Sequence, residues 1–214
     1  VQAYTPPPPP PAATLPVSDD FDDDVADYLD ARSGVWQATG GRYHASPAGD
    51  AVSTWRLAEA LPTDLDLRAT VNADPASGGL YSNAFIVFDY QNGTDFKFAG
   101  PYVASGKWAI GHRSGTKWVI DASTQQPISA MTDYDLQVVI QNDSDVTLLV
   151  DGVAKVSQSY SGSLSDGEVG LATWKAIARF DDVSVQQYET PPPPPSGTLP
   201  LLEDFDDGEA DFFE

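Results

Sequence analysis

Acidic side chains are the most numerous groups in this chain that could do chemistry, so their spacing is the first question. Asp and Glu make up 32 of the 214 residues, against 11 Lys and Arg, for a formal net charge of −21. Glycoside hydrolysis needs two carboxylates that flank one bond, and on one strand such a pair stands at alternate positions. Asp64 and Asp66 alternate in this way, as do Asp133 and Asp135, but both pairs stand at strand starts, where turn and edge roles are commoner. The three Glu between the proline tracts lack such a partner, so no catalytic pair is predicted: Glu59, Glu168 and Glu189.

Other reactive side chains are scarce. The chain has no Cys, which excludes disulfides and thiolate chemistry, and its 2 His are too few for a histidine-rich zinc site. The negative charge argues against nucleic acid and anionic lipid as partners and favours cation binding, although a merely solvated acidic surface is the alternative. No run of about 18 apolar residues occurs, so no membrane insertion is expected. No signal peptide is visible and the first residue is Val, which favours a mature or excised segment.

Aromatic side chains are the other group with a chemical use. Sugar-binding sandwiches stack rings on pyranose faces and add hydrogen bonds from amides and carboxylates. Most rings of this chain lie in strand-like segments, where packing in the core is the competing role. Trp174 lies in an expected loop between Leu171 and Phe180 and is the best exposed candidate. The predicted carbohydrate-binding set is Trp174, Tyr90, Tyr102 and Trp118.

The elements that must position these groups are strands. Short segments rich in β-branched and aromatic residues are separated by Gly, Asn, Asp and Ser, and several alternate polar with apolar residues. Asn92-Gly93, Ser114-Gly115, Asn142-Asp143 and Asp151-Gly152 are typical of hairpin turns. With a single expected helical turn in Asp22–Asp30, the pattern predicts an all-β fold, a two-sheet antiparallel jelly-roll sandwich. The predicted strands are 42–46, 51–57, 65–73, 80–90, 95–100, 107–112, 116–121, 134–141, 145–151, 153–160, 167–173 and 178–188.

Two proline tracts bound this sandwich, and the segment after the second tract repeats the segment after the first. Residues 6–11 and 191–195 are unbroken proline, which forms an extended polyproline II helix and acts as a stiff spacer. Thr14-Leu15-Pro16 returns as Thr198-Leu199-Pro200, and Phe21-Asp22-Asp23 returns as Phe205-Asp206-Asp207. The expected organisation is a proline-rich linker (1–13), a sandwich domain (14–189), a second linker (190–197) and the start of a further repeat or an inter-subunit pairing strand (198–214).

Four groups of motifs, in order, give the sandwich a resemblance to a known superfamily. They are Asp19-Asp20-Phe21 with Gly34-Val35-Trp36 and Gly40-Gly41-Arg42-Tyr43, the run 84–96 (AFIVFDYQNGTDF), 107–111 with 115–118, and 150–152 with 167–172 and 180–185. The sequence resembles the concanavalin A-like lectin/glucanase superfamily, in particular the laminin-G-like and carbohydrate-binding-module-like domains of bacterial secreted proteins. The resemblance implies a jelly roll whose first and last strands lie side by side. Because this fold hosts lectins, hydrolases and inert spacers, it does not fix the function.

The resemblance also implies a structural calcium ion near the junction of the first and last strands. Carried onto this sequence, its ligands are Asp20, the backbone of Gly41, and Asp181 or Asp182. Calcium takes six to eight oxygen ligands, and a cation stabilises carboxylates that otherwise repel one another. Turn formation and solvation are the competing roles for these residues. Ca²⁺ is therefore the expected cofactor.

Lyases of the same superfamily use a set of His, Tyr, Arg and Gln side chains. His112, Arg113 and Tyr102 imitate part of that set, but the surrounding motif does not match. A polar hairpin arm is the favoured interpretation, and we expect no enzyme activity.

The repeat provides the leading hypothesis for function. Leu15 to Phe21 is expected to form an edge strand, and its second copy has no sheet to complete within this chain. The apolar residues of that copy would pair with a next repeat or with another molecule: Leu199, Leu201, Leu202 and Phe205. A head-to-tail contact of this kind does not close and generates a filament.

We predict a non-catalytic structural or adhesive repeat unit of an extracellular filament or giant surface adhesin, whose partners are copies of itself. The alternative is a secreted carbohydrate-binding module beside a polysaccharide-degrading enzyme. Both hypotheses place the protein outside the cell or at the cell surface, and polysaccharide is a partner in the second.

Overall fold

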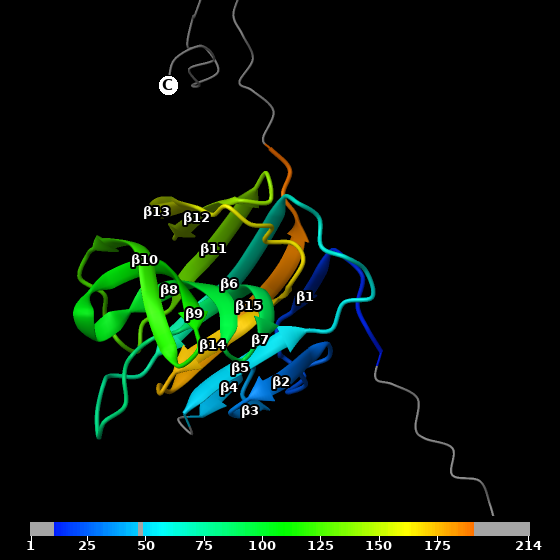
Figure 1. The fold of residues 1–214 in the computed structure, drawn as a ribbon. Helices are drawn as coiled ribbons and strands as arrows, with labels where there is room; N and C mark the ends of the chain where they lie inside the picture. The colour runs from blue at the N-terminus through cyan, green and yellow to red at the C-terminus, as the bar shows by residue number, and fades with distance from the viewer. Residues whose placement is uncertain (1–10, 47–48, 191–214) are drawn as a thin grey trace, which may run out of the picture.

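Two antiparallel β-sheets face each other across a hydrophobic core (Figure 1). The computed structural model describes residues 11–46 and 49–190. The eight-stranded sheet has the order β13-β12-β11-β6-β15-β4-β3, with β1 paired to β15, and the seven-stranded sheet has the order β10-β9-β8-β7-β14-β5-β2. The first sheet comprises β1 (Val17–Asp19), β3 (Val35–Ala38), β4 (Tyr43–Ser46), β6 (Leu65–Ala73), β11 (Tyr134–Gln141), β12 (Asp145–Val150), β13 (Val153–Ser159) and β15 (Ala178–Gln187). The second comprises β2 (Leu29–Ser33), β5 (Asp50–Trp55), β7 (Phe85–Asn92), β8 (Asp95–Tyr102), β9 (Lys107–Ser114), β10 (Lys117–Gln125) and β14 (Glu168–Trp174).

The predicted all-β jelly-roll sandwich is confirmed. Within the described residues the only helix is the short η1 (Val103–Ser105), and each predicted strand matches an observed one within a few residues. The sequence pattern missed β2 and β3, which are short and meet at Gly34. Gly34 has φ +79°, and a Cβ there would lie 2.4 Å from the Cβ of Ala51, so the chain passes this corner only as glycine.

The helical turn expected in Asp22–Asp30 is wrong. The carboxylates of Asp19 and Asp23 accept hydrogen bonds from backbone N–H groups two residues further on, at 3.0 and 2.9 Å. Phe21 and Asp24 have positive φ angles of 53° and 60°. Side chains that bond their own backbone in this way favour turns over helix, and β2 begins directly after them.

Strand alternation decides which side chains enter the core. On β6, every second residue from Leu65 to Ala73 is at most 4 % exposed, and burying a Leu or Val side chain contributes about 1.5–3 kcal/mol. The predicted hairpin turns are confirmed, among them those that follow β11 and β12. Asn142, Asp143 and Asp151 have φ angles of 54°, 56° and 50°, which suits tight hairpins because the left-handed region matches the strand twist. The intervening β6 residues form a polar outer face: Asp66, Arg68, Thr70 and Asn72.

The first and last strands lie side by side, as the resemblance implied. Val17 pairs with Val185 and Asp19 with Val183 in the antiparallel register of β1 and β15. Beyond β1, Phe21 is fully buried and stacks on Tyr43 with ring centroids 5.3 Å apart. The predicted edge strand from Leu15 to Phe21 thus appears as a shorter strand followed by an aromatic anchor.

The segment that precedes β1 is also tied to the domain. Ala13 N donates to Arg56 O at 2.9 Å, and Ala58 N donates to Ala13 O at 2.8 Å. Most of the first proline tract and all of the second tract lie outside the described residues. The same holds for the predicted pairing strand with Leu199, Leu201, Leu202 and Phe205. In the described part of the chain, no helix has the length and apolarity needed to cross a membrane.

Candidate functional site

The four rings predicted to bind sugar lie together on the outer face of the seven-stranded sheet. Tyr90, Tyr102, Trp118 and Trp174 are all half-buried and pack against a second hydrophobic cluster. That cluster consists of buried side chains from β5, β7, β8 and β14: Val52, Phe85, Val87, Phe96, Phe98 and Ala172. The structure therefore brings the four predicted rings together, but it packs them against this second hydrophobic cluster.

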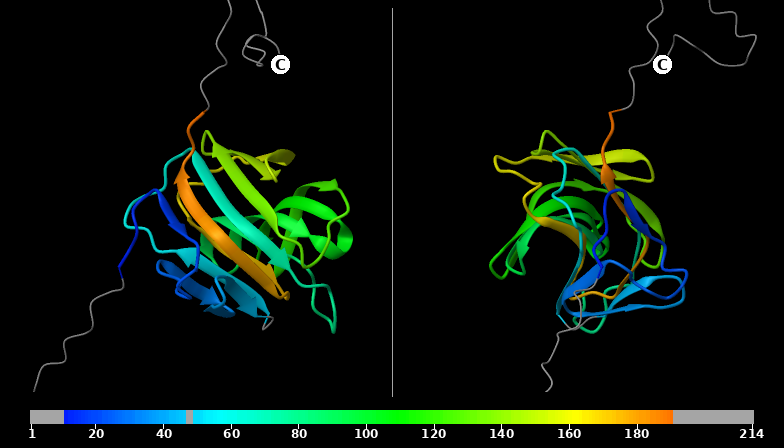
Figure 2. Two further views of the ribbon diagram at one scale, coloured as in Figure 1. Left: turned by 180° about the vertical axis from the view of Figure 1, so that it is seen from behind. Right: turned by 90° about the vertical axis from the view of Figure 1, so that its right-hand side faces the viewer.

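The seven-stranded sheet curls so strongly that this outer face becomes a trough. Arg113 on β9 and Asp50 on β5 are separated by β8, β7 and β14. Neighbouring strands lie about 4.8 Å apart, so these two strands would stand about 19 Å apart in a flat sheet. Nevertheless, Arg113 Nη2 lies 2.7 Å from Asp50 Oδ2. The two side chains therefore bridge the trough, and the arc of its strands is visible in the right-hand view of Figure 2.

Rings in the trough pack mainly on one another. Trp118 stacks on Trp174 with centroids 6.0 Å apart, and Arg113 lies over the Trp118 ring at 5.5 Å. Tyr81, which is 45 % exposed, lies 4.4 Å from Trp174 between centroids. Burial raises the pKa of the Tyr102 phenol far above its usual value. The expected exposed loop position of Trp174 is wrong, because this residue ends β14 and is half-buried.

A groove at the rim of the trough is open beside the fourth predicted ring, Tyr90. We call it the Tyr90 groove; its volume is about 520 Å³. Burial raises the pKa of the Tyr90 phenol, which stays a neutral hydroxyl at ordinary pH. The groove is lined by Arg32, Trp55, Arg56, Leu57, Glu59, Ala60, Leu61, Tyr90, Gln91, Ser165, Asp166, Gly167 and Glu168.

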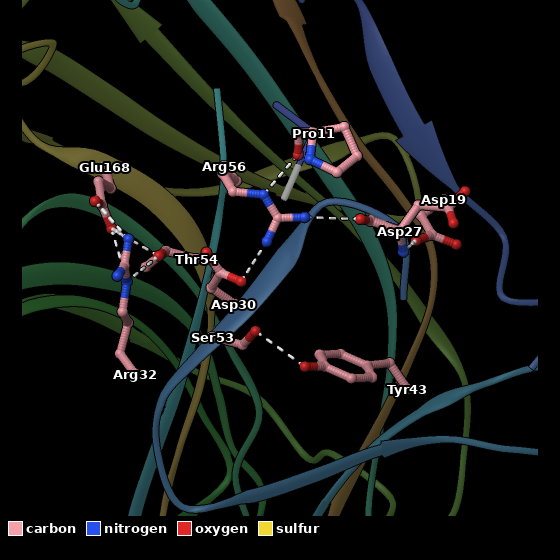
Figure 3. Close-up of polar contacts among 10 residues, drawn as sticks. All are labelled: Pro11, Asp19, Asp27, Asp30, Arg32, Tyr43, Ser53, Thr54, Arg56 and Glu168. Atoms are coloured by element: carbon pink, nitrogen blue, oxygen red, sulfur yellow. Dashed lines mark hydrogen bonds and ion pairs between the residues drawn. The ribbon is translucent and has the colours of Figure 1, made fainter. Parts of the chain in front are cut away.

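An arginine–carboxylate fork forms one polar wall of the Tyr90 groove (Figure 3). Arg32 Nη2 donates to Glu168 Oε1 at 2.7 Å, and Arg32 Nε donates to Oε2 at 3.1 Å. Thr54 Oγ1 donates to the same Oε2 at 2.6 Å. The Arg32 and Glu168 side chains are 36 % and 42 % exposed, so the pair is fixed but still faces solvent. Fixed donors and acceptors of this kind suit hydroxyl groups, which both donate and accept.

Arg56 connects the groove to the N-terminal segment (Figure 3). Its Nε donates to Pro11 O at 2.6 Å, its Nη2 donates to Asp27 O at 2.9 Å, and its Nη1 pairs with the Asp30 carboxylate. Sequence reasoning missed Arg32 and Arg56 altogether. The fork joins residues 136 positions apart, and no local pattern signals such a contact.

The alternating carboxylates hold hydrogen-bond networks on the other sheet. Asp66 accepts from Arg68 and two glutamines. The guanidinium of Arg42 donates to both oxygens of Asp133 at 2.8 and 2.7 Å, and these bonds lower the pKa of that carboxyl to about 2. Of the lyase-like residues, Tyr102 and Arg113 both face the trough, whereas His112 does not. His112 pairs with Asp121 and the adjacent Arg113 with Asp50, because neighbouring residues on a strand point to opposite faces.

The predicted calcium ligands lie at the β1–β15 junction, but they converge only in part. Continuing the register of β1 places Asp20 opposite Asp182. The Asp20 carboxylate accepts the backbone N–H of Asp22 at 3.2 Å. Gly41 N donates to Asp24 Oδ1 at 3.1 Å, and a Cβ at Gly41 would lie 3.4 Å from Asp22 Oδ1.

A guanidinium already faces this junction. Burial, together with the charges of Asp182 and Asp22, raises the pKa of Asp181. Arg42 Nε lies 3.7 Å from Asp181 Oδ2 and supplies positive charge. Among residues 11–46 and 49–190, no group of three or more His, Cys, Asp or Glu side chains is arranged to hold a metal ion. The side chains alone therefore do not form a calcium site, and calcium stays a prediction.

Comparison with known proteins supports the fold. No protein-family model matches the sequence, and no curated protein matches it. The carbohydrate-binding module CBM66 from Bacillus subtilis matches with a TM-score of 0.66 at 15 % identity, over 83 % of this chain and 100 % of that one. The carbohydrate recognition domain of Emp47p matches with a TM-score of 0.58 at 12 % identity, over 79 % and 94 %. A xylan β-1,4-xylosidase from Bacillus halodurans C-125 matches with a TM-score of 0.57 at 14 % identity, over 87 % of this chain but 41 % of that one.

These likenesses show a lectin-like jelly-roll sandwich. The narrower laminin-G-like resemblance remains a prediction.

The bridge across the trough gives a test of its structural role. Asp50→Ala leaves the Arg113 guanidinium without its carboxylate, although that side chain is only 9 % exposed. We expect a loss of about 3–5 kcal/mol in the free energy of unfolding, measured by urea denaturation. Arg32→Ala, which breaks the exposed fork, should cost only about 0–1 kcal/mol. Equal losses in the two variants would contradict the bridge.

Proposed function

We propose that the sandwich is a non-catalytic carbohydrate-binding module that takes a polysaccharide chain into the Tyr90 groove. One observation carries the proposal: the groove combines a ring with an oriented arginine–carboxylate fork at the rim of a lectin-like sandwich. The likeness to solved carbohydrate-binding domains supports it. The alternative interpretation of the sequence, a secreted module beside a polysaccharide-degrading enzyme, is therefore our leading proposal.

The groove recognises sugar through two kinds of contact. The face of Tyr90 stacks on a pyranose or furanose ring, and the Arg32–Glu168 fork exchanges hydrogen bonds with ring hydroxyls. Gln91 Nε2 donates to Asp166 Oδ1 at 3.1 Å, which fixes a second amide–carboxylate pair at the same groove. The charged lining residues nearly cancel, with Arg32 and Arg56 against three carboxylates, so a neutral glycan fits better than an acidic one.

Variants in the groove test this function. Tyr90→Ala and Glu168→Gln should each weaken binding to neutral polysaccharides by about tenfold or more, because each removes a contact worth about 1.5–3 kcal/mol. Affinity gel electrophoresis with xylan, cellulose, mannan and fructan measures the change. Tyr90→Phe keeps the ring and should retain most of the affinity.

Tyr81→Ala is the matched control, since it removes an exposed ring from the trough and leaves the Tyr90 groove intact. If Tyr81→Ala loses binding and Tyr90→Ala keeps it, the trough and not the groove binds sugar.

A second candidate function is the structural or adhesive repeat unit of an extracellular filament or surface adhesin. The observation that favours it is the shallow attachment of β1, which pairs with β15 through three residues and is anchored by Val17 and Phe21. The chain repeats these residue types at Leu201 and Phe205. A second copy of the segment could take the same place on another domain, because strand exchange needs only an open β15 edge.

Removing the second copy tests the repeat hypothesis. We expect the full chain to form filaments in electron microscopy, and we expect a chain ending at Tyr188 to stay monomeric. Leu201→Ala/Phe205→Ala keeps the chain length and should behave like the truncation. Filaments from the truncated chain, or monomers from the full chain, contradict the hypothesis.

Calcium at the β1–β15 junction is a further proposal, with Asp20, Asp181, Asp182 and backbone oxygen at Gly41 as ligands. Isothermal titration with CaCl₂ should detect binding, and calcium at 100 times its Kd should raise Tm by about 5–10 °C. Asp181→Asn should weaken binding, whereas Asp145→Asn, an exposed carboxylate on β12, should not. No binding heat in the unaltered chain contradicts the calcium proposal.

A further inference from the structure

The outer face of the eight-stranded sheet carries a groove that the proposed function does not use. Its volume is about 1050 Å³. Outward side chains of β6, β11, β12 and β15 form its floor, and residues 59–62 and 187–189 border it. In the left-hand view of Figure 2 this face points toward the viewer, and no described element covers it. We call it the outer-face groove.

A buried carboxylate organises the floor of the outer-face groove. The Asp66 side chain is 4 % exposed, and Arg68 Nη2 donates to its Oδ2 at 2.8 Å. Gln137 Nε2 donates to Oδ1 at 3.0 Å, and Gln186 Nε2 donates to Oδ2 at 3.1 Å. These donors come from β6, β11 and β15, so one carboxylate fixes polar side chains of three adjacent strands. A buried charge needs such bonds, and in return it orients the groups that make them.

The groups that Asp66 orients keep unused hydrogen-bonding capacity. No described residue donates to the side-chain oxygen of Gln137 or Gln186. Arg68 is 52 % exposed, and among the described residues its Nη1 has no acceptor. The floor thus presents two amide acceptors and a guanidinium donor in fixed positions. Such alternation suits a chain of hydroxyl groups, each of which donates and accepts.

The shape and charge of the outer-face groove indicate which class of ligand it can bind. A neighbouring hollow of about 320 Å³ shares Arg68 and Gln137 with it, so the depression continues along β6 and β11. An extended polymer fits a continuous depression of this kind better than a compact molecule does. Arg68 offsets Asp66, which leaves Glu59 and Glu189 as a net negative charge at the border. That charge disfavours uronate or sulfate groups.

We propose that the outer-face groove is a second glycan site, which binds a neutral polysaccharide strand through hydroxyl hydrogen bonds to Arg68, Gln137 and Gln186. The inference rests on the proposed carbohydrate binding, but it uses a different face and different residues. In this proposal the Tyr90 groove binds one sugar ring by stacking, whereas the outer-face groove binds an extended stretch of the polysaccharide chain.

Isothermal titration tests the inference on the full chain, with hexasaccharides of xylan, cellulose, mannan and fructan as probes and oligogalacturonate as the acidic comparison. We expect two sites per chain for one neutral probe and no binding of oligogalacturonate. Gln137→Ala/Gln186→Ala should remove one site, and Tyr90→Ala should remove the other. Gln158→Ala on β13, a glutamine outside both grooves, should change neither.

Each outcome separates the two proposals. One site that Tyr90→Ala alone abolishes overturns the outer-face site and leaves the Tyr90 groove standing. One site that only Gln137→Ala/Gln186→Ala abolishes supports the outer-face site and overturns the Tyr90 groove. No binding of any neutral probe overturns both. If the double variant fails to fold, the amide resonances of β6 and β11 in the unaltered chain decide, because bound glycan must shift them.

Discussion

The curl of the seven-stranded sheet is the constraint on which the rest of the structure depends. It brings β9 within reach of β5, so Arg113 can pair with Asp50 across three intervening strands. Aromatic side chains fill the trough that results. Packing this dense leaves few ring faces for a ligand. Open polar surface remains at the rim, where Tyr90 lies, and on the outer face of the opposite sheet.

This acidic chain has few basic side chains, and its arginines in particular pair with carboxylates. The sequence has six arginines, and in the described structure each one pairs with a carboxylate: Arg32, Arg42, Arg56, Arg68, Arg113 and Arg179. Of the lysines, Lys97 alone does so within the same residues. Arginine suits this use because its planar fork binds both oxygens of a carboxylate. The arginines therefore mark the places where acidic side chains are ordered and not merely solvated.

Local pattern predicted the strands and the hairpins, because alternation and turn residues act over a few positions. It failed between Asp22 and Asp30, where apolar spacing suggested a helical turn but carboxylates bond their own backbone. The four rings predicted to bind sugar do lie on one face, but the pattern could not tell that they pack together, since stacking between Trp118 and Trp174 depends on the curl of the whole sheet. The fork of Arg32 and Glu168 lay beyond sequence reasoning for the same reason. Contacts between distant strands follow from topology, which single-residue patterns do not encode.

The two proposed glycan grooves share one wall, and that wall also contacts the segment that precedes β1. Glu59, Ala60 and Leu61 line both the Tyr90 groove and the outer-face groove. The same loop is held to the N-terminal segment, because Glu59 Oε1 accepts from Leu15 N at 2.6 Å and Arg56 donates to Pro11 O at 2.6 Å. A polysaccharide strand that crosses this loop would meet both grooves, and the second contact would form at high effective concentration. The loop after β5 thus borders both proposed glycan grooves and is hydrogen-bonded to Pro11 and Leu15.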